Sequence, residues 1–170
     1  KKENAMKKVY LAGPDVFAHN ASEVAEQHKT LCSAHGFTPL HPADGSHHTA
    51  KAIYQANIAL IRSADAVLAN INPFRGAEVD SGTAFEIGFA IALGIPVVAY
   101  LDGPITVIDQ VKKFYGPIYL DQESNQWRDQ NENLIENFNL PVNLMLAESC
   151  DIVYGDLLAA IIQLQRRWYD

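Results

Sequence analysis

Residues 70–90 read NINPFRGAEVDSGTAFEIGFA, and this stretch decides which fold the rest of the chain is expected to adopt. A loop rich in proline, glycine and acids leads here into an apolar segment, residues 81–93, with the length of a helix. A helix that is apolar on all sides is normally buried. Glu86 is the one charged residue inside it. Because a buried charge is costly unless it is paired or used, Glu86 is the strongest functional candidate in the sequence.

Strand-like and helix-like segments alternate on both sides of this stretch. A helix is expected from Asn20 or Ser22 to Ala34, another at residues 50–63, and the Glu86 helix follows. This alternation predicts an α/β fold, in which helices cover both faces of a parallel sheet. The strands expected between the helices are residues 8–12, 37–40, 66–71 and 95–101.

Parallel sheets of this kind bind ligands at the carboxyl ends of their strands. Three segments that contain candidate residues follow strands there, namely residues 10–17, 41–44 and 70–86. The C-terminal third is less regular. A fifth strand is expected at residues 117–120, a helix at 131–138, another beginning at Leu140, and a last helix at 154–168.

Composition and charge limit the class of protein. The 170 residues are 48% hydrophobic and 19% charged, which is typical of a soluble globular domain. The net charge of −7 argues against binding to a nucleic-acid polymer. No apolar run is long enough to span a membrane, and no signal-peptide core precedes residue 9. We expect a single domain at residues 6–170, with Met6 as the native start and residues 1–5 as a tag remnant.

Neither a cofactor nor a metal is expected. The two cysteines, Cys32 and Cys150, form no CxxC pair and suggest a reducing, cytoplasmic location. His47 and His48 are adjacent in a loop and cannot form a helical metal-binding pair. The first turn, which begins at Gly13, does not match the GxGxxG pattern of nicotinamide-binding proteins.

The residues around Glu86 allow more than one interpretation. Glu86 is either a structural acid paired with a buried arginine or tyrosine, or a covalent nucleophile at a sugar carbon. Asp80 is either only the N-cap of the Glu86 helix or a carboxylate that faces a ligand, and the two interpretations can coexist. Glu78 and Asp80 would repel a phosphate, whereas carboxylates accept hydrogen bonds from sugar hydroxyls.

Three further candidates are weaker on local grounds. Tyr10 is either a core aromatic or the hydroxyl that orients Glu86. Phe17 is either part of the core or a stacking surface for a flat ring. Asp65 precedes the third strand, which places it toward the wrong end of the sheet.

Four motifs follow one another along the body of the chain, namely YLAGP at residues 10–14, SADAV at 63–67, NPFRG at 72–76 and DSGTAFEIG at 80–88. Taken together, they resemble the nucleoside 2-deoxyribosyltransferase family, and the resemblance runs from Lys8 to about Glu148. A later tripeptide, residues 143–145, resembles the segment that this family inserts into the neighbouring subunit's site.

The resemblance implies a flavodoxin-like, or Rossmann-like, three-layer fold with a five-stranded parallel sheet. It implies that Glu86 attacks C1′ of a 2′-deoxynucleoside and that a second purine or pyrimidine base then attacks the covalent intermediate, with retention of configuration. Asp65 matches the acid that handles the proton on the base, which outweighs the local interpretation. Tyr10 matches the hydroxyl that positions the nucleophile.

The resemblance also implies a homo-oligomer that acts in nucleotide salvage. It implies that the other matched positions bind substrate. One chain contributes Gly13, Phe17 and Asp80, and its neighbour contributes Asn143 and Met145. The insertion at residues 122–139 matches no motif, and His41 and Asp44 are guesses as readers of the base edge.

Two other functions remain open at this point. A 2′-deoxynucleoside 5′-phosphate N-hydrolase needs a small hydroxyl residue where Asp80 stands. A non-catalytic nucleotide sensor would use Glu86 as a ligand only. The cytokinin-activating phosphoribohydrolases share part of the Glu86 motif, but their phosphate-binding glycines are missing before Gly82.

Overall fold

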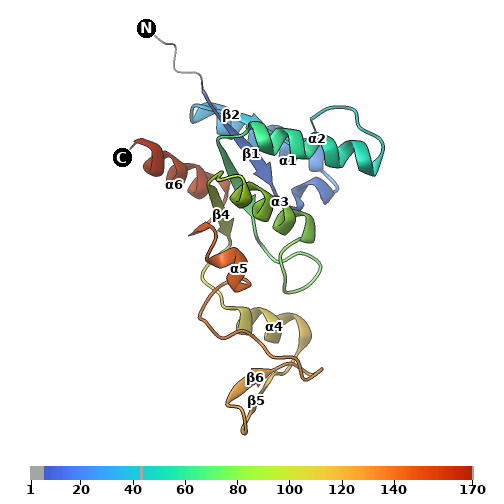
Figure 1. Ribbon diagram of the computed structural model, residues 1–170, viewed down its shortest axis with the longest axis vertical. Helices are drawn as coiled ribbons and strands as arrows, with labels where there is room; N and C mark the ends of the chain where they lie inside the picture. Colours follow the sequence, from blue (N-terminus) through green and yellow to red (C-terminus); the bar gives the residue numbers. More distant parts are fainter. Residues whose placement is uncertain (1–5, 43, 170) are drawn as a thin grey trace.

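The computed structural model describes residues 6–42 and 44–169, so the expected tag remnant at residues 1–5 lies outside the described residues. Its centre is a five-stranded parallel sheet with the strand order β2-β1-β3-β4-β7 (Figure 1). Counted in chain order, this is the 2-1-3-4-5 order of flavodoxin-like folds, as expected. The strands are β1 (Lys7–Ala12), β2 (Phe37–Leu40), β3 (Ala66–Asn70), β4 (Val97–Leu101) and β7 (Asp151–Tyr154).

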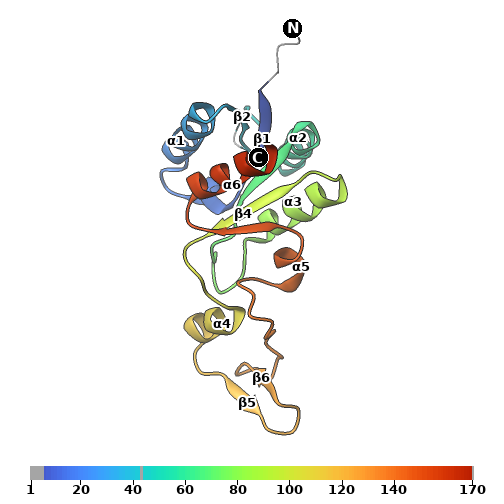
Figure 2. The same ribbon diagram turned by 90° about the vertical axis from the view of Figure 1, so that its left-hand side faces the viewer.

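Helices cover both faces of this sheet, which gives the three layers predicted from the alternation. Figure 2 shows α1 (Ala21–Ala34) and α6 (Leu157–Tyr169) on one side of the sheet. On the other side lie α2 (Ala50–Ser63) and α3 (Ser81–Ala92). The short helix α5 (Leu144–Ala147) packs against α3.

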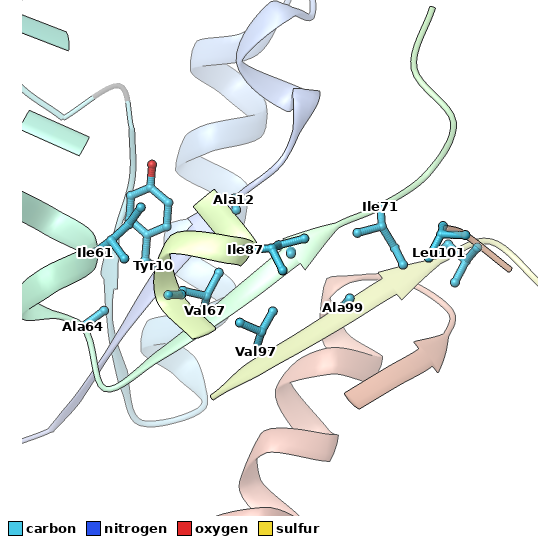
Figure 3. Packing of buried hydrophobic residues seen from close by; sticks show 13 residues of the cluster. Tyr10, Ala12, Ile61, Ala64, Val67, Ile71, Ile87, Val97, Ala99 and Leu101 are labelled. Carbon is cyan, nitrogen blue, oxygen red and sulfur yellow. The ribbon is translucent and has the colours of Figure 1, made fainter. Parts of the chain in front are cut away.

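Alternate residues of each strand enter two separate cores, because successive side chains of a strand point to opposite faces. On the α1 and α6 side, Val9 of β1 packs in one cluster with Tyr100 of β4. On the α2 and α3 side, Tyr10 packs with Ile61 and Ile87 (Figure 3). The Tyr10 hydroxyl points out of this aliphatic cluster (Figure 3).

The Glu86 helix begins and ends as its sequence indicates. The Asp80 carboxylate caps α3 by accepting a hydrogen bond from the Thr83 N–H at 2.9 Å. Gly94, in the left-handed region at φ 72°, follows the C-cap Leu93. Only one face of α3 is buried, however, and Phe85 is 51% exposed on the other. The expectation of a helix buried on all sides was therefore wrong for the single chain.

The C-terminal third differs from the expectation. Residues 119–121 form β5 (Tyr119–Asp121), which pairs antiparallel with β6 (Gln126–Arg128) in a separate two-stranded sheet. The fifth strand of the main sheet is instead β7, a short edge strand whose polar first residue and length of four residues gave little periodic signal. Consequently the last helix begins at Leu157 rather than at residue 154.

Residues 131–138 form no helix. Asp129 accepts backbone hydrogen bonds from Asn131 at 2.9 Å and Asn133 at 3.0 Å, which closes a loop in place of helical bonds. The helix expected from Leu140 is reduced to α5. An unexpected helix, α4 (Val107–Tyr115), is started by a capping box of Thr106 and Asp109. Together α4, β5 and β6 project from the sheet as an arm (Figures 1 and 2).

Candidate active site

The centre of the candidate site is a hydrogen bond between strand β1 and helix α3. The Tyr10 hydroxyl donates to Oε2 of Glu86. Tyr10 is fully buried in the sheet, and burial together with the negative charge of Glu86 raises its pKa. The phenol therefore keeps its proton and acts as a fixed donor that orients the carboxylate.

Glu86 is a weaker acid than an ordinary glutamate, because its pKa is raised. Burial raises its pKa to about 7, and the charge of Asp80 adds to this rise. The hydrogen bond from Tyr10 acts in the opposite direction, because it stabilises the carboxylate. A carboxylate that is desolvated, oriented and ionised near neutral pH is suited to attack an electrophilic carbon.

The Glu86 carboxylate faces a cavity of about 440 Å³ between α2, α3 and the segment after β1. Its walls are mostly apolar and aromatic, as in sites for small planar ligands. Two acids, Glu86 and Asp80, are the only titratable carboxylates among the described residues that line it. The remaining lining residues are Gly13, Val16, Phe17, Pro42, Ile53, Tyr54, Asn57, Ile58, Ile61, Gly82 and Phe85.

Asp80 both caps α3 and lines the cavity. Its Oδ2 accepts hydrogen bonds from both the backbone N–H and the hydroxyl of Thr83, each at 2.9 Å. These bonds fix the carboxylate at the start of α3, on the wall of the cavity. Oδ1 has no hydrogen bond to the part of the chain that the structure describes, so it is available to a ligand.

The segment after β1 supplies the mouth of the cavity. Gly13 leaves no room for a side chain, since a Cβ there would lie 2.8 Å from Cβ of Asn70 and 2.7 Å from Oδ2 of Asp15. Phe17 closes the short 3-10 helix η1 (Pro14–Phe17) and is 57% exposed. The structure thus places Gly13, Phe17, Asp80 and Glu86 on one cavity, with Tyr10 behind them as the hydrogen-bond donor to Glu86. Their roles in binding and catalysis stay predictions.

Asp65 lies elsewhere, which corrects the expectation that it serves this cavity. It precedes β3 at the amino end of the sheet, whereas the cavity lies toward the carboxyl ends. Its Oδ2 accepts the backbone N–H of Lys8 at 2.8 Å, and Oδ1 lies 3.4 Å from Nζ of Lys7. These contacts join the starts of β1 and β3, so the local sequence interpretation was the better guide.

Asn143 and Met145 also lie outside the cavity of their own chain. Asn143 caps α5, and its amide donates to Oε1 of Glu136 at 2.7 Å. Met145 is 72% exposed on α5. Their placement in a neighbour's site stays a prediction. Of the guessed base readers, Asp44 instead binds Nζ of Lys29 at 2.6 Å.

One residue of the cavity was missed by sequence reasoning. Asn57 of α2 faces the cavity, and among the described residues its buried Oδ1 has no hydrogen-bond partner. A detectable signal existed: Ile53, Asn57 and Ile61 are spaced four residues apart and share one helix face. A polar residue in such an apolar row is the kind of misfit that identified Glu86.

Comparison with known proteins shows the family of the chain. A family model described as nucleoside 2-deoxyribosyltransferase matches residues 9–145. The chain belongs to this family. Membership indicates an enzyme that transfers glycosyl groups or cleaves N-glycosidic bonds.

Solved structures of this family resemble the chain over nearly its whole length. A 2-desoxiribosyltransferase from Leishmania mexicana superposes with a TM-score of 0.76 and 32% identity, covering 96% of this chain and 99% of that one. A 2-deoxyribosyltransferase from Bacillus psychrosaccharolyticus gives a TM-score of 0.56 at 18% identity, covering 96% and 92% of the two chains. The second similarity is evidence for the fold alone.

Two other relatives extend the range of similarity. The CMP N-glycosidase BcmB of Clostridium botulinum shares the fold, with a TM-score of 0.51 and 15% identity over 94% of this chain and 99% of that one. An uncharacterised protein of Schizosaccharomyces pombe is 32% identical over 102 residues, or 54% of this chain. The match covers 48% of that protein, so the chain spans about half the length of this curated relative.

Within residues 6–42 and 44–169, no group of three or more histidine, cysteine, aspartate or glutamate side chains is placed to hold a metal ion. No helix in the same residues has the length and hydropathy needed to cross a membrane.

Proposed function

We propose that the protein is a nucleoside 2-deoxyribosyltransferase that exchanges the base of 2′-deoxynucleosides through a covalent intermediate on Glu86. The observation that carries the proposal is the Glu86 carboxylate, which is held by Tyr10 and faces a largely apolar cavity. Family membership supports the same reaction class.

The proposed reaction has two displacements at one carbon. A Glu86 carboxylate oxygen attacks C1′ while the N-glycosidic bond breaks and its electron pair leaves with the base. The departing base takes up a proton from solvent as it leaves, and the incoming base releases one to solvent when its nitrogen bonds to C1′, so protons balance over the exchange. A second base then attacks C1′ and releases Glu86, so configuration is retained. Because the Glu86 pKa is about 7, a substantial share of the enzyme carries the ionised nucleophile at neutral pH.

The cavity walls suggest a division between sugar and base. Asp80, beside Glu86, is suited to accept hydrogen bonds from sugar hydroxyls through Oδ1. Phe17 offers a ring face for the base. Asn57 lies on the wall formed by α2, and its unpaired Oδ1 can accept a hydrogen bond from a base N–H. Asp65 has no part in this scheme.

The proposed active unit is a homo-oligomer, at least a dimer. The exposure of Met145 leaves that side chain available to a neighbouring subunit. Asn143 would complete the sugar site of the neighbour. An active species that stays strictly monomeric in sedimentation would contradict this part of the proposal.

Two alternatives make different demands on the cavity. A nucleoside 5′-phosphate N-hydrolase would place a phosphate near Asp80, where like charges repel each other. We therefore expect Asp80→Ser to shift preference toward 5′-phosphorylated substrates, and unchanged selectivity would remove this argument. A non-catalytic sensor would bind nucleosides reversibly without a covalent step.

Base exchange tests the proposal directly. The protein is mixed with deoxyinosine or thymidine and free adenine, and products are separated by chromatography. Deoxyadenosine is the expected product. Free base and deoxyribose alone would identify a hydrolase, and turnover of 5′-phosphates only would reject the role given to Asp80. Tight binding without turnover, and without a mass shift after incubation with a 2-fluoroarabinosyl nucleoside, would identify a sensor.

A further inference from the structure

The mouth of the Glu86 cavity carries two stacked phenylalanines and an arginine that contacts both. The Phe17 ring, part of the cavity lining, lies against the Phe74 ring with centroids 5.4 Å apart and planes 18° from parallel. Cζ of Arg75 lies 5.3 Å from the Phe17 centroid and 4.5 Å from the Phe74 centroid. We call these three side chains the Phe17–Phe74–Arg75 clasp.

The turn that presents Arg75 is held in an uncommon backbone conformation. Arg75 lies in the left-handed region at φ 53°, where residues with long side chains are rarely found. The Phe74 N–H donates to the Glu78 carbonyl at 2.9 Å, which closes the turn. From α4, the Tyr115 hydroxyl accepts the Ala77 N–H at 3.3 Å. Such strain persists only where the surroundings enforce it.

Fold stability does not account for this arrangement. Arg75 is exposed and, among the described residues, has no salt bridge. Phe17 is more than half exposed, so the clasp adds little to either core. A cation–π contact at an exposed position is weak, but it is strong enough to bias the orientation of a ring that has little else to hold it.

We propose that Phe74 and Arg75 are positioning residues, which hold the Phe17 ring as a preformed stacking surface for the planar nucleobase. This inference rests on the proposed function and deepens it, because it assigns the NPFRG motif to recognition of the base. A ring that is already ordered loses less conformational freedom when a base stacks on it. Stacking on an aromatic face accepts purines and pyrimidines alike.

Binding of two ligands separates this role from a general structural one. Calorimetry measures the affinity for free adenine, which can stack, and for 1,2-dideoxyribose, which has no base. In Arg75→Met we expect adenine to bind about three- to tenfold more weakly, in line with the loss of two weak cation–π contacts. Affinity for the sugar should stay unchanged, and Arg75→Lys should restore most of the adenine affinity.

Arg62 supplies the matched control. Its Cζ lies 5.1 Å from the Phe89 ring centroid, and neither residue lines the cavity. Arg62→Met removes an equivalent contact and should leave both affinities as in the wild type. Phe74→Leu keeps the backbone of the turn and should weaken adenine binding in the same selective way as Arg75→Met.

Three results would overturn the inference in distinguishable ways. Unchanged adenine affinity in Arg75→Met and Phe74→Leu, with normal binding by the wild type, rejects the clasp alone. Equal weakening of adenine and of the sugar means that the turn shapes the whole cavity, which also rejects it. A wild-type protein that binds neither a base nor a nucleoside rejects the proposed function, and the clasp with it.

Discussion

Two tyrosines, one on each face of the sheet, lie near carboxylates at its carboxyl edge. Tyr10 of β1 faces α3, and its hydroxyl donates a hydrogen bond to Glu86. Tyr100 of β4 faces the opposite layer and lines a hollow of about 480 Å³, together with Asp15, Asp102 and Asp156. Both tyrosines are buried, and burial raises the pKa of each.

The two sides differ in how their carboxylates are used. Both oxygens of Asp15 accept hydrogen bonds from the Asn70 amide, at 3.2 and 3.1 Å, so this acid holds the loop after β1. Glu86 instead projects toward apolar walls, where desolvation raises its pKa to about 7. The comparison teaches that the raised pKa of Glu86 depends on the apolar walls of its cavity, and its orientation on the hydrogen bond from Tyr10. A cluster of several acids, such as the one near Tyr100, does not produce these properties by itself.

The largest expected effect is on Glu86. Glu86→Gln should lower kcat by at least about a thousandfold, since the loss of a covalent nucleophile leaves only the contribution of binding. Chromatography of the exchange products measures this, and circular dichroism checks the fold. On the other face, Asp102→Asn should keep activity within about twofold. If Glu86→Gln kept most of its activity, the carboxylates on the two faces of the sheet would be equivalent for catalysis, and Glu86 would not be the nucleophile.

The next largest effect is expected at Tyr10, with Tyr100 as its counterpart on the other face of the sheet. A hydrogen bond to a charged group contributes about 1.5–3 kcal/mol, so Tyr10→Phe should lower kcat/KM by roughly 10- to 100-fold. Because that bond lowers the Glu86 pKa, its loss should also move the rising limb of the pH profile to higher pH. Tyr100→Phe should change neither quantity. Equal effects of the two substitutions would remove the distinction between the faces.

Asp80 should have a smaller effect through charge. Asn is as good a helix cap as Asp, so Asp80→Asn should keep α3 intact. Its neutral amide removes the negative charge that raises the Glu86 pKa. The rising limb of kcat/KM should therefore move to lower pH, opposite to the shift in Tyr10→Phe. An alkaline shift would show that the two carboxylates do not interact as described.

Asp65 tests the boundary of the site. If it only joins the starts of β1 and β3, Asp65→Asn should change kcat/KM by less than about twofold, as surface changes away from a site usually do. Steady-state kinetics with one nucleoside and several acceptor bases would measure this. A fall in kcat/KM that depends on the acceptor base would instead show that Asp65 takes part in the reaction.

The smallest effect concerns stability and pH. Glu86 has a pKa near 7 when folded and near 4.5 in its unperturbed state, so the folded protein binds more protons between these values. Its contribution to the free energy of unfolding is therefore greatest below pH 4.5 and is lost as the pH rises through 7. Glu86→Gln should raise Tm relative to the wild type at pH 8 but little at pH 5. Equal differences at both pH values would contradict the raised pKa.

Much of the sheet and its best candidate could be predicted from local pattern. Strands β1 to β4 and helices α1 to α3 have regular apolar periodicity, and their alternation requires a parallel sheet. Glu86 could be found because it is the one charged residue in an otherwise apolar helix. Asp80 could be found because it stands where that helix begins. The C-terminal third could not be predicted as well, because β7 and α5 are short and depend on contacts with β4 and α3.

Only the tertiary structure decided which distant residues share the cavity. Sequence spacing could not bring the Tyr10 hydroxyl to Glu86 or place Asn57 on the same cavity as Glu86, because these contacts arise from strand direction and layer packing. The order of elements along the chain determined a parallel sheet with Glu86 in the helix after its third strand. Packing of α2 and α3 over the carboxyl edge of the sheet then determined the walls of the cavity. These walls bury Glu86 and thereby raise its pKa.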